Sequence, residues 1–275
     1  MKLSIVLSTQ PTHFQAVSLS GSLENNLKRI ADWGYQGVEL AIRDPKMLDA
    51  AALLKLIQSC GLEVPAIGTG QAWNEEGLSF TDPIPDVRSA AVKRIQSHIP
   101  LAAQFNAVII IGLVRGIIKP GVDQALAMAW LTEALQQCCR AARFAGVRLA
   151  LEPINRYETT LINSVEQGLE LVKAVGEDNF GLLLDTFHMN IEETSIEESI
   201  QQCGKHIYHF HAADSNRAYP GAGHLDFRSI LQSLNTAGYR GFVSGEFMPK
   251  PEADTAAKMS IATLQPILKS ISESL

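Results

Sequence analysis

The chain has 275 residues, of which 46% are hydrophobic, and its formal net charge is −6. That charge argues against a nucleic-acid-binding protein, because contacts to phosphate need clustered lysines and arginines. No apolar stretch is long enough to span a membrane, and the N-terminal apolar run is too short for a signal peptide. The 4 cysteines form no Cys-x-x-Cys pair and are expected to be buried, reduced thiols. We therefore expect a cytoplasmic protein.

Short apolar runs alternate with longer amphipathic segments from one end of the chain to the other. The apolar runs predict eight strands, at residues 3–7, 37–40, 63–67, 107–111, 148–151, 181–184, 207–210 and 242–245. Apolar residues at helical spacing predict helices between them, most clearly at 23–33, 125–145 and 164–175. Eight strand–helix units with no linker between them favour an α/β protein, a single-domain (β/α)8 TIM barrel spanning residues 1–275.

Glycines and loops support this division of the chain. Four glycines stand where a helix is expected to end, as a residue after the C-cap should: Gly34, Gly61, Gly146 and Gly238. No Gly-x-Gly-x-x-Gly motif follows the first strand, which weakens the alternative of an open dinucleotide-binding sheet. The two longest connections, 68–86 and 212–225, are expected to be functional loops.

Four residues of metal-ligand type stand where predicted strands meet their following loops. They are Glu152, Asp185, His211 and Glu246. Any one of them alone is as readily a helix cap or an ion-pair partner. In a barrel, however, the carboxyl ends of all strands converge on one face, so these four would become neighbours. Three carboxylates and one imidazole suit one divalent metal ion, and the oxygen-rich set favours Mn²⁺ over Mg²⁺, Co²⁺ or Zn²⁺.

Four stretches carry a family resemblance: LEPINRYET, LLLDTFHMNIEE, HFHAADSNR and GHLDF. They resemble the ketose 3-epimerase branch of the xylose isomerase-like TIM barrels, the group that includes D-tagatose 3-epimerase. The resemblance covers the whole chain and is strongest over residues 149–246. It implies the same four metal ligands, a homodimer or homotetramer, and three substrate-binding residues, Glu158, His188 and Arg217.

Three further segments, AIRDP, AIGTGQAW and IIIGLVRG, are similar to those of 5-keto-L-gluconate epimerases. This nearer resemblance implies 5-keto-L-gluconate as the leading substrate. Arg43 and Arg115 follow the second and fourth predicted strands, where each either offers a fork to a substrate carboxylate or pairs with a neighbouring loop. Trp73 is expected either to form an apolar wall against the sugar carbons or to pack in the core or a lid. Glu39 either contacts a hydroxyl or pairs with Arg43.

The expected chemistry is epimerisation next to a carbonyl, through an enediolate whose charge the metal stabilises. A proton must leave one face of the carbon and another must return to the opposite face, which needs two bases. We expect Glu152 and Glu246 to be this pair, and His188 to donate to a substrate oxygen. His209 lies two residues before His211 and on the same side of the strand. It either orients a ligand carboxylate or is a hydrogen-bonded core histidine.

Several other functions are compatible with the same sequence features. A ketose 3-epimerase, an aldose–ketose isomerase, a hydroxypyruvate isomerase and an inosose dehydratase would all use enediolate chemistry at a metal. A DNA-repair endonuclease of the endonuclease IV type would need histidines after the third and fourth strands, where this chain has Gly68 and Gly112. A non-catalytic sugar-binding protein would need no opposed bases. The sequence therefore predicts a metal-dependent epimerase of a small keto sugar or keto acid, with no nucleic-acid or membrane partner.

Overall fold

Eight parallel strands close into a barrel in the computed structural model, which describes residues 1–273. Neighbouring strands are consecutive in the chain, and the eighth pairs with the first to complete the ring. The strands are β1 (Lys2–Ser8), β2 (Gly37–Ala41), β3 (Ala66–Gly68), β4 (Val108–Ile111), β5 (Leu149–Leu151), β6 (Phe180–Asp185), β7 (Ile207–Ala212) and β8 (Phe242–Gly245). The predicted (β/α)8 barrel is therefore confirmed.

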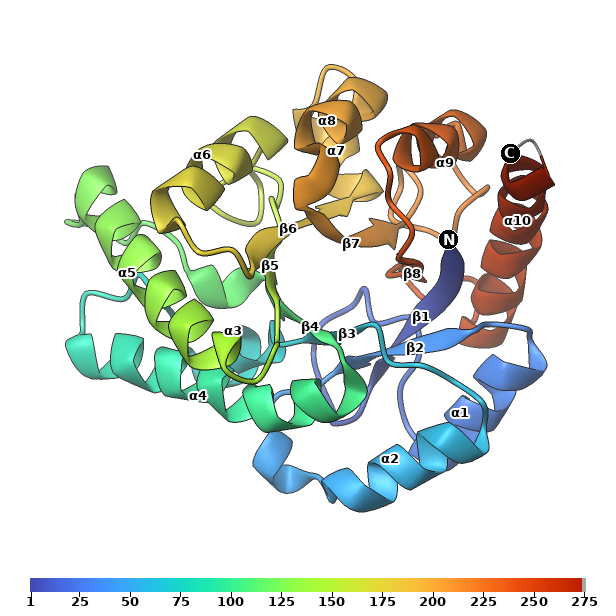
Figure 1. The fold of residues 1–275 in the computed structure, drawn as a ribbon, viewed down its shortest axis with the longest axis horizontal. Helices are drawn as coiled ribbons and strands as arrows, with labels where there is room; N and C mark the ends of the chain where they lie inside the picture. Colours follow the sequence, from blue (N-terminus) through green and yellow to red (C-terminus); the bar gives the residue numbers. More distant parts are fainter. Residues whose placement is uncertain (274–275) are drawn as a thin grey trace.

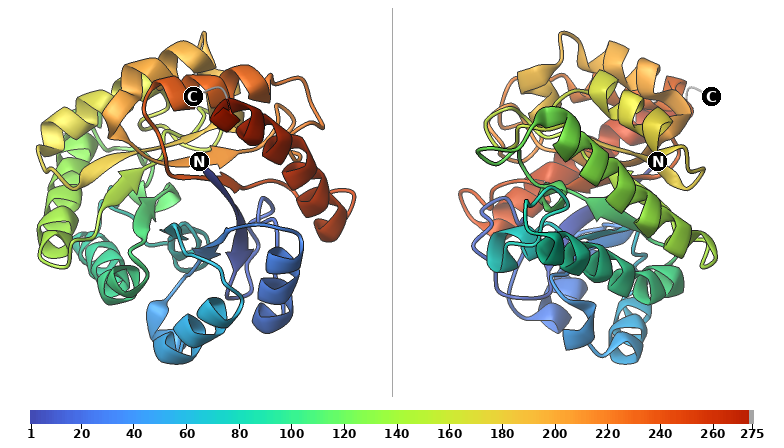
Figure 2. Two further views of the ribbon diagram at one scale, coloured as in Figure 1. Left: turned by 45° about the vertical axis from the view of Figure 1, so that its right-hand side comes forward. Right: turned by 90° about the vertical axis from the view of Figure 1, so that its left-hand side faces the viewer.

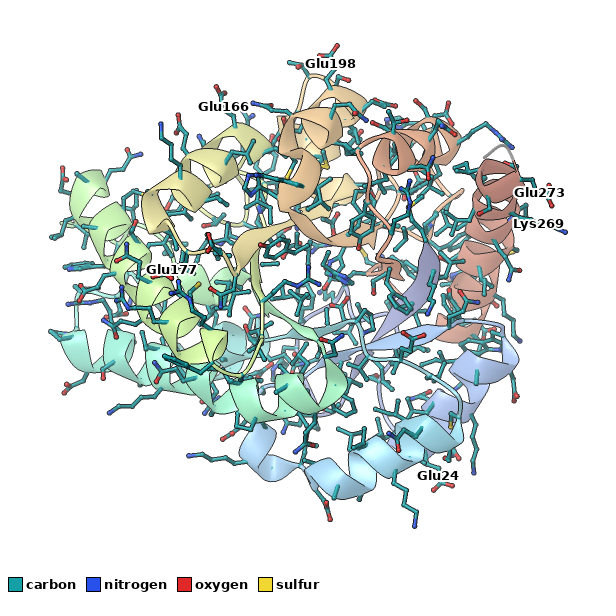
Figure 3. All side chains as sticks on the ribbon, viewed as in Figure 1. Glu24, Glu166, Glu177, Glu198, Lys269 and Glu273 are labelled. Atoms are coloured by element: carbon teal, nitrogen blue, oxygen red, sulfur yellow. The ribbon has the colours of Figure 1, made fainter. Side chains whose placement is uncertain are left out.

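Helices surround the strands on the outside, as Figure 1 and the two further views of Figure 2 show. The α-helices of residues 1–273 are α1 (Leu23–Asp32), α2 (Ala50–Ser59), α3 (Gln71–Glu76), α4 (Pro85–Phe105), α5 (Gln124–Arg143), α6 (Val165–Val175), α7 (Thr186–Glu192), α8 (Ile196–Cys203), α9 (Phe227–Thr236) and α10 (Ala253–Glu273). Short 3₁₀ turns lie at Pro45–Met47, Leu113–Arg115 and Gly204–His206. Charged side chains such as Glu24, Glu166 and Glu198 extend outward from this layer (Figure 3).

The strands are buried on both of their sides, and β4 shows this most completely because it is apolar throughout. All four residues of β4 are buried, and they alternate between two clusters. Ile109 and Ile111 belong to the large core beneath the helices, whereas Val108 and Ile110 belong to a small cluster inside the barrel. Full burial of each such side chain contributes about 1.5–3 kcal/mol relative to leaving it exposed. The packed barrel thus provides a rigid floor for the strand ends.

Element boundaries follow local chemistry. The third strand is shorter than predicted and begins at Ala66, because Pro65 has no amide hydrogen to give to the ladder. Part of the predicted loop at residues 68–86 forms α3. The four glycines predicted after helix ends all have positive φ, among them Gly34 at 93° and Gly146 at 68°.

Two expectations from composition can be compared with the fold. The four cysteines are free, and Cys138, Cys139 and Cys203 are buried, whereas Cys60 is partly exposed. Within residues 1–273, no helix combines the length and the apolar character needed to cross a membrane.

Candidate active site

The four residues predicted as metal ligands gather where β5, β6, β7 and β8 end. Each offers one ligand atom, and these atoms all lie within 4.8 Å of one another. The Nδ1 atom of His211 lies 3.5 Å from Glu246 Oε2, 3.6 Å from Asp185 Oδ2 and 3.9 Å from Glu152 Oε1. We call Glu152, Asp185, His211 and Glu246 the ligand cluster.

Strand register brings the cluster together. Asp185 pairs with His211 across β6 and β7, and Ala212 pairs with Gly245, the residue before Glu246. Since neighbouring parallel strands end at the same edge, residues far apart in the chain meet there.

Asp185 uses its two carboxylate oxygens differently. Oδ1 caps α7, accepting hydrogen bonds from the N–H groups of Phe187 at 2.7 Å and His188 at 3.4 Å. Oδ2 faces His211 in the cluster. The same side chain therefore starts the helix that carries His188 and contributes to the ligand cluster.

The ligand cluster fits a divalent cation. Two of its buried atoms, Glu152 Oε1 and His211 Nδ1, have no hydrogen-bond partner among residues 1–273. Burial, and then the charge of Glu246, raise the pKa of Glu152 well above its usual range. Unpaired buried polar atoms and crowded carboxylates are costly unless a positive charge joins them. A divalent metal ion would give the unpaired atoms a partner and would balance the charge of the carboxylates. This donor set suits Mn²⁺ and similar ions.

Glu39, at β2, lies on the other side of His211 from the cluster. It is 1% exposed, and its carboxylate faces His209 Nε2 at 2.7 Å and His211 Nε2 at 3.0 Å. Burial alone would raise the pKa of Glu39, but the two imidazoles lower it below its usual range. Glu39 thus pairs with two histidines rather than with Arg43, and His209 contacts this glutamate rather than a carboxylate of the cluster.

His188 is placed to donate a hydrogen bond into the cluster. The side-chain amide of Asn155 donates to its Nδ1 at 2.8 Å and to Glu158 Oε1 at 3.0 Å, which fixes the amide orientation. Since Nδ1 accepts, Nε2 carries the proton, and it lies 3.6 Å from Glu152 Oε1. Burial lowers the pKa of His188 to about 4, so the imidazole is neutral at physiological pH.

Glu158 and Arg217 lie beside His188 at the cavity. Their side chains form an ion pair, with Arg217 Nη1 2.7 Å from Glu158 Oε1. The guanidinium also lies over the rings of Phe187 at 4.8 Å and Phe14 at 5.4 Å. The backbone of Arg217 has φ of 58°, a conformation that only strong local contacts maintain in a residue with a side chain.

A cavity opens over the ligand cluster. Its wall includes the three predicted substrate-binding residues Glu158, His188 and Arg217. Apolar side chains supply much of the remaining wall, and neutral polar side chains stand among them. These wall residues include Val6, Phe14, Val17, Leu113, Ile154, Gln71 and Asn74.

Arg115 contacts a neighbouring loop, the second of the two roles that the sequence left open for it. It is 0% exposed, and its guanidinium donates to the backbone carbonyls of Gly112 at 3.1 Å, Ile162 at 3.0 Å and Glu152. It is not part of the cavity wall. The physical reason is that several backbone carbonyls of the loops after β4 and β5 converge on one point, and together they hold the buried guanidinium there. Its side chain donates four hydrogen bonds to backbone carbonyls and is buried outside the cavity wall, so it does not face a substrate carboxylate.

Arg43 and Trp73 also lie outside the cavity wall. Arg43 Nε is 3.6 Å from Glu76 Oε1, so the arginine forms the loop ion pair that was the alternative expectation. Trp73 lies within α3 and is partly buried.

Gln71 is a wall residue that the sequence did not single out. Its Nε2 donates to Ser8 Oγ at 2.8 Å, and Ser8 Oγ in turn donates to the Gln10 carbonyl. The amide orientation is therefore fixed, and Gln71 Oε1 has no partner among residues 1–273. The side chain is 3% exposed. A free acceptor in the wall of a cavity suits a hydroxyl group, but a sequence cannot reveal which atom is left unpaired.

Comparisons with known proteins agree with this geometry. The model of the xylose isomerase-like TIM barrel family matches residues 27–267. An L-ribulose 3-epimerase of Mesorhizobium japonicum is 32% identical over 85% of this chain and 78% of its own. A D-psicose 3-epimerase of Agrobacterium fabrum is 30% identical over 79% of this chain and 76% of its own. A solved structure of L-ribulose 3-epimerase superposes with a TM-score of 0.85 at 25% identity, covering 99% of this chain and 96% of that one.

Proposed function

Because the chain belongs to the ketose 3-epimerase branch of the xylose isomerase-like TIM-barrel family, we propose that it is a divalent-metal-dependent epimerase that inverts C3 of a ketose. The observation that supports this most directly is the ligand cluster. It sets two glutamates, Glu152 and Glu246, beside the same imidazole at 3.9 Å and 3.5 Å. Binding a sugar without reaction would need no such pair of potential bases.

The proposed mechanism assigns one glutamate to each face of the substrate. One takes the proton from C3 and leaves an enediolate, and the other returns a proton to the opposite face. Their strands, β5 and β8, are three positions apart around the ring, so the two carboxylates approach the cluster from different directions. A bound divalent cation would supply Lewis-acid stabilisation of the negative charge on the enediolate oxygens. Mn²⁺ is the ion we propose.

His188 and Arg217 complete the proposed site. His188 is a neutral imidazole whose Nε2–H points toward the cluster, so it donates to a substrate oxygen without carrying a charge itself. Arg217 adds a fixed positive charge beside Glu158 that favours an anionic intermediate. Both side chains are held by neighbours, which limits their reorganisation during the reaction.

A neutral ketose fits this cavity better than a keto acid. In the part of the chain that the structure describes, Arg217 is the one arginine or lysine in the wall, and it is already paired with Glu158. Arg43 and Arg115, the two arginines that favoured 5-keto-L-gluconate, both lie outside the wall. A substrate carboxylate would therefore lie beside glutamates with no unpaired arginine or lysine in the wall to bind it. We propose that the resemblance of the first half of the chain to 5-keto-L-gluconate epimerases does not extend to substrate choice.

Solvent isotope exchange tests the proposal. The protein is stripped with EDTA, reloaded with Mn²⁺ and incubated in D₂O with D-psicose, D-tagatose, L-ribulose or 5-keto-L-gluconate. We expect deuterium at C3 of at least one ketose, together with its C3 epimer on a chiral column, and loss of both without metal. Exchange confined to 5-keto-L-gluconate would contradict the ketose assignment. Exchange into none of the four, with Mn²⁺ bound, would contradict an epimerase.

A further inference from the structure

The contacts of one buried glutamate point beyond the ligand cluster itself. We propose that Glu39 is a positioning residue that fixes the tautomer and orientation of His211, and thereby aims the Nδ1 lone pair of His211 at the metal. This inference rests on the metal requirement of the proposed function. It does not depend on which sugar the enzyme converts.

Hydrogen-bond chemistry decides which nitrogen of His211 carries the proton. An ionised carboxylate only accepts hydrogen bonds. His211 Nε2 lies 3.0 Å from both oxygens of Glu39, so Nε2 must be the donor. A histidine ligates a metal ion only as the neutral imidazole, which has one N–H, so Nδ1 is the atom that offers the lone pair in that form. That atom is one of the two unpartnered buried atoms of the ligand cluster.

A second imidazole holds Glu39 in this position. His209 Nε2 donates to Glu39 Oε2 at 2.7 Å, and the rings of His209 and His211 meet edge to face with centroids 5.3 Å apart. His209 and His211 lie two residues apart on β7, so both reach the same side of the strand. The carboxylate thus accepts hydrogen bonds from two donors on β7. Its own strand, β2, lies three positions from β7 around the ring.

The burial of Glu39 is consistent with this role. A carboxylate that is 1% exposed is costly unless its oxygens are hydrogen-bonded, and here they are bonded by the two imidazoles. Glutamine at this position would place an N–H₂ group against one of two imidazole N–H groups. One histidine would then have to change tautomer or turn away.

The test is the affinity of the stripped protein for Mn²⁺ alone, measured by titration calorimetry. Glu39→Gln is expected to weaken Mn²⁺ binding by about 10–100-fold, the range seen when a residue that orients a ligating histidine is lost. Asp82→Asn is the matched control. Asp82 is also nearly fully buried, at 3% exposed, and is paired with Lys119, but it lies outside the cavity wall. We expect this control to lower stability and to leave Mn²⁺ affinity unchanged.

A second measurement needs no variant at position 39 and covers the case in which Glu39→Gln does not fold. Protein with ¹⁵N-labelled histidine is loaded with diamagnetic Zn²⁺, and the ring signals are assigned with single-histidine variants. We expect His211 to carry its proton on Nε2. A proton on Nδ1 would overturn the inference, as would wild-type Mn²⁺ affinity in folded Glu39→Gln. Failure of the ketose exchange assay with these two results intact would instead contradict the proposed function.

Discussion

The first four and the last four strands end at the same face of the barrel, yet their ends carry different chemistry. After β5–β8 stand the ligand-cluster residues, two of whose buried atoms have no partner among residues 1–273. At β1–β4 the buried acid is Glu39, and its oxygens are hydrogen-bonded by two imidazoles. The difference shows that a buried ionisable residue does not by itself mark a reactive centre. Incomplete pairing of buried ionisable groups does so: among residues 1–273, the two such side chains with an unpartnered buried atom, Glu152 and His211, both belong to the ligand cluster.

The sharpest test of the difference between the two sets of strand ends is Glu246→Gln, at the end of β8. We expect kcat for the best ketose to fall by about 10²–10⁴-fold, because a base is lost. The metal-free protein should be at least as stable as wild type, because one of the crowded carboxylates that raise the pKa of Glu152 is gone. Steady-state kinetics and urea unfolding measure the two effects. A fully active variant would remove Glu246 from the reaction.

Arg115→Lys should affect mainly the fold. Lysine cannot reach the carbonyls that the guanidinium binds, so we expect the free energy of unfolding to fall by about 3 kcal/mol. The ratio of KM values for a keto acid and a neutral ketose should not change, since Arg115 is not in the cavity wall. A selective loss of the keto acid would restore the role that the sequence suggested for this arginine.

Gln71→Leu tests whether the region after β3 contributes to substrate binding. The replacement keeps the size of the side chain but removes the unpaired Oε1, so we expect KM for the ketose to rise about five-fold, as loss of roughly 1 kcal/mol would give. The value of kcat should change little, whereas the free energy of unfolding should fall by about 1 kcal/mol, because the hydrogen bond from Nε2 to Ser8 Oγ is also lost. Unchanged KM for every ketose in the panel would show that this oxygen does not contact substrate.

Arg43→Ala should have the smallest effect. Its ion pair with Glu76 is partly exposed and long, at 3.6 Å, so we expect a loss of less than about 1 kcal/mol in unfolding free energy. The value of kcat/KM for the ketose should match wild type. A large drop would mean that Arg43 reaches the substrate after all.

The sequence predicted the barrel and singled out four residues that the structure brings together, because both depend on patterns that repeat. Apolar runs such as the one at β4 indicate strands that are buried on both sides. Residues of metal-ligand type at the ends of successive strands indicate a shared site, because these ends meet at one face of a barrel. The direction of a long side chain on a loop follows no such pattern. Arg115 turns inward because several loop carbonyls converge beside it, and only the folded loops determine where those carbonyls lie. Glu39 likewise pairs across the barrel with residues about 170 positions away.

The two oxygens of Asp185 create a thermodynamic linkage between the cap of α7 and the ligand cluster. An alanine at this position would remove both, and weaker metal binding could not be separated from fraying of the helix that holds His188. Asparagine keeps a capping oxygen of nearly equal quality while withdrawing the charge. With Asp185→Asn, a change in metal affinity would therefore reflect the ligand cluster alone and not the loss of the helix cap.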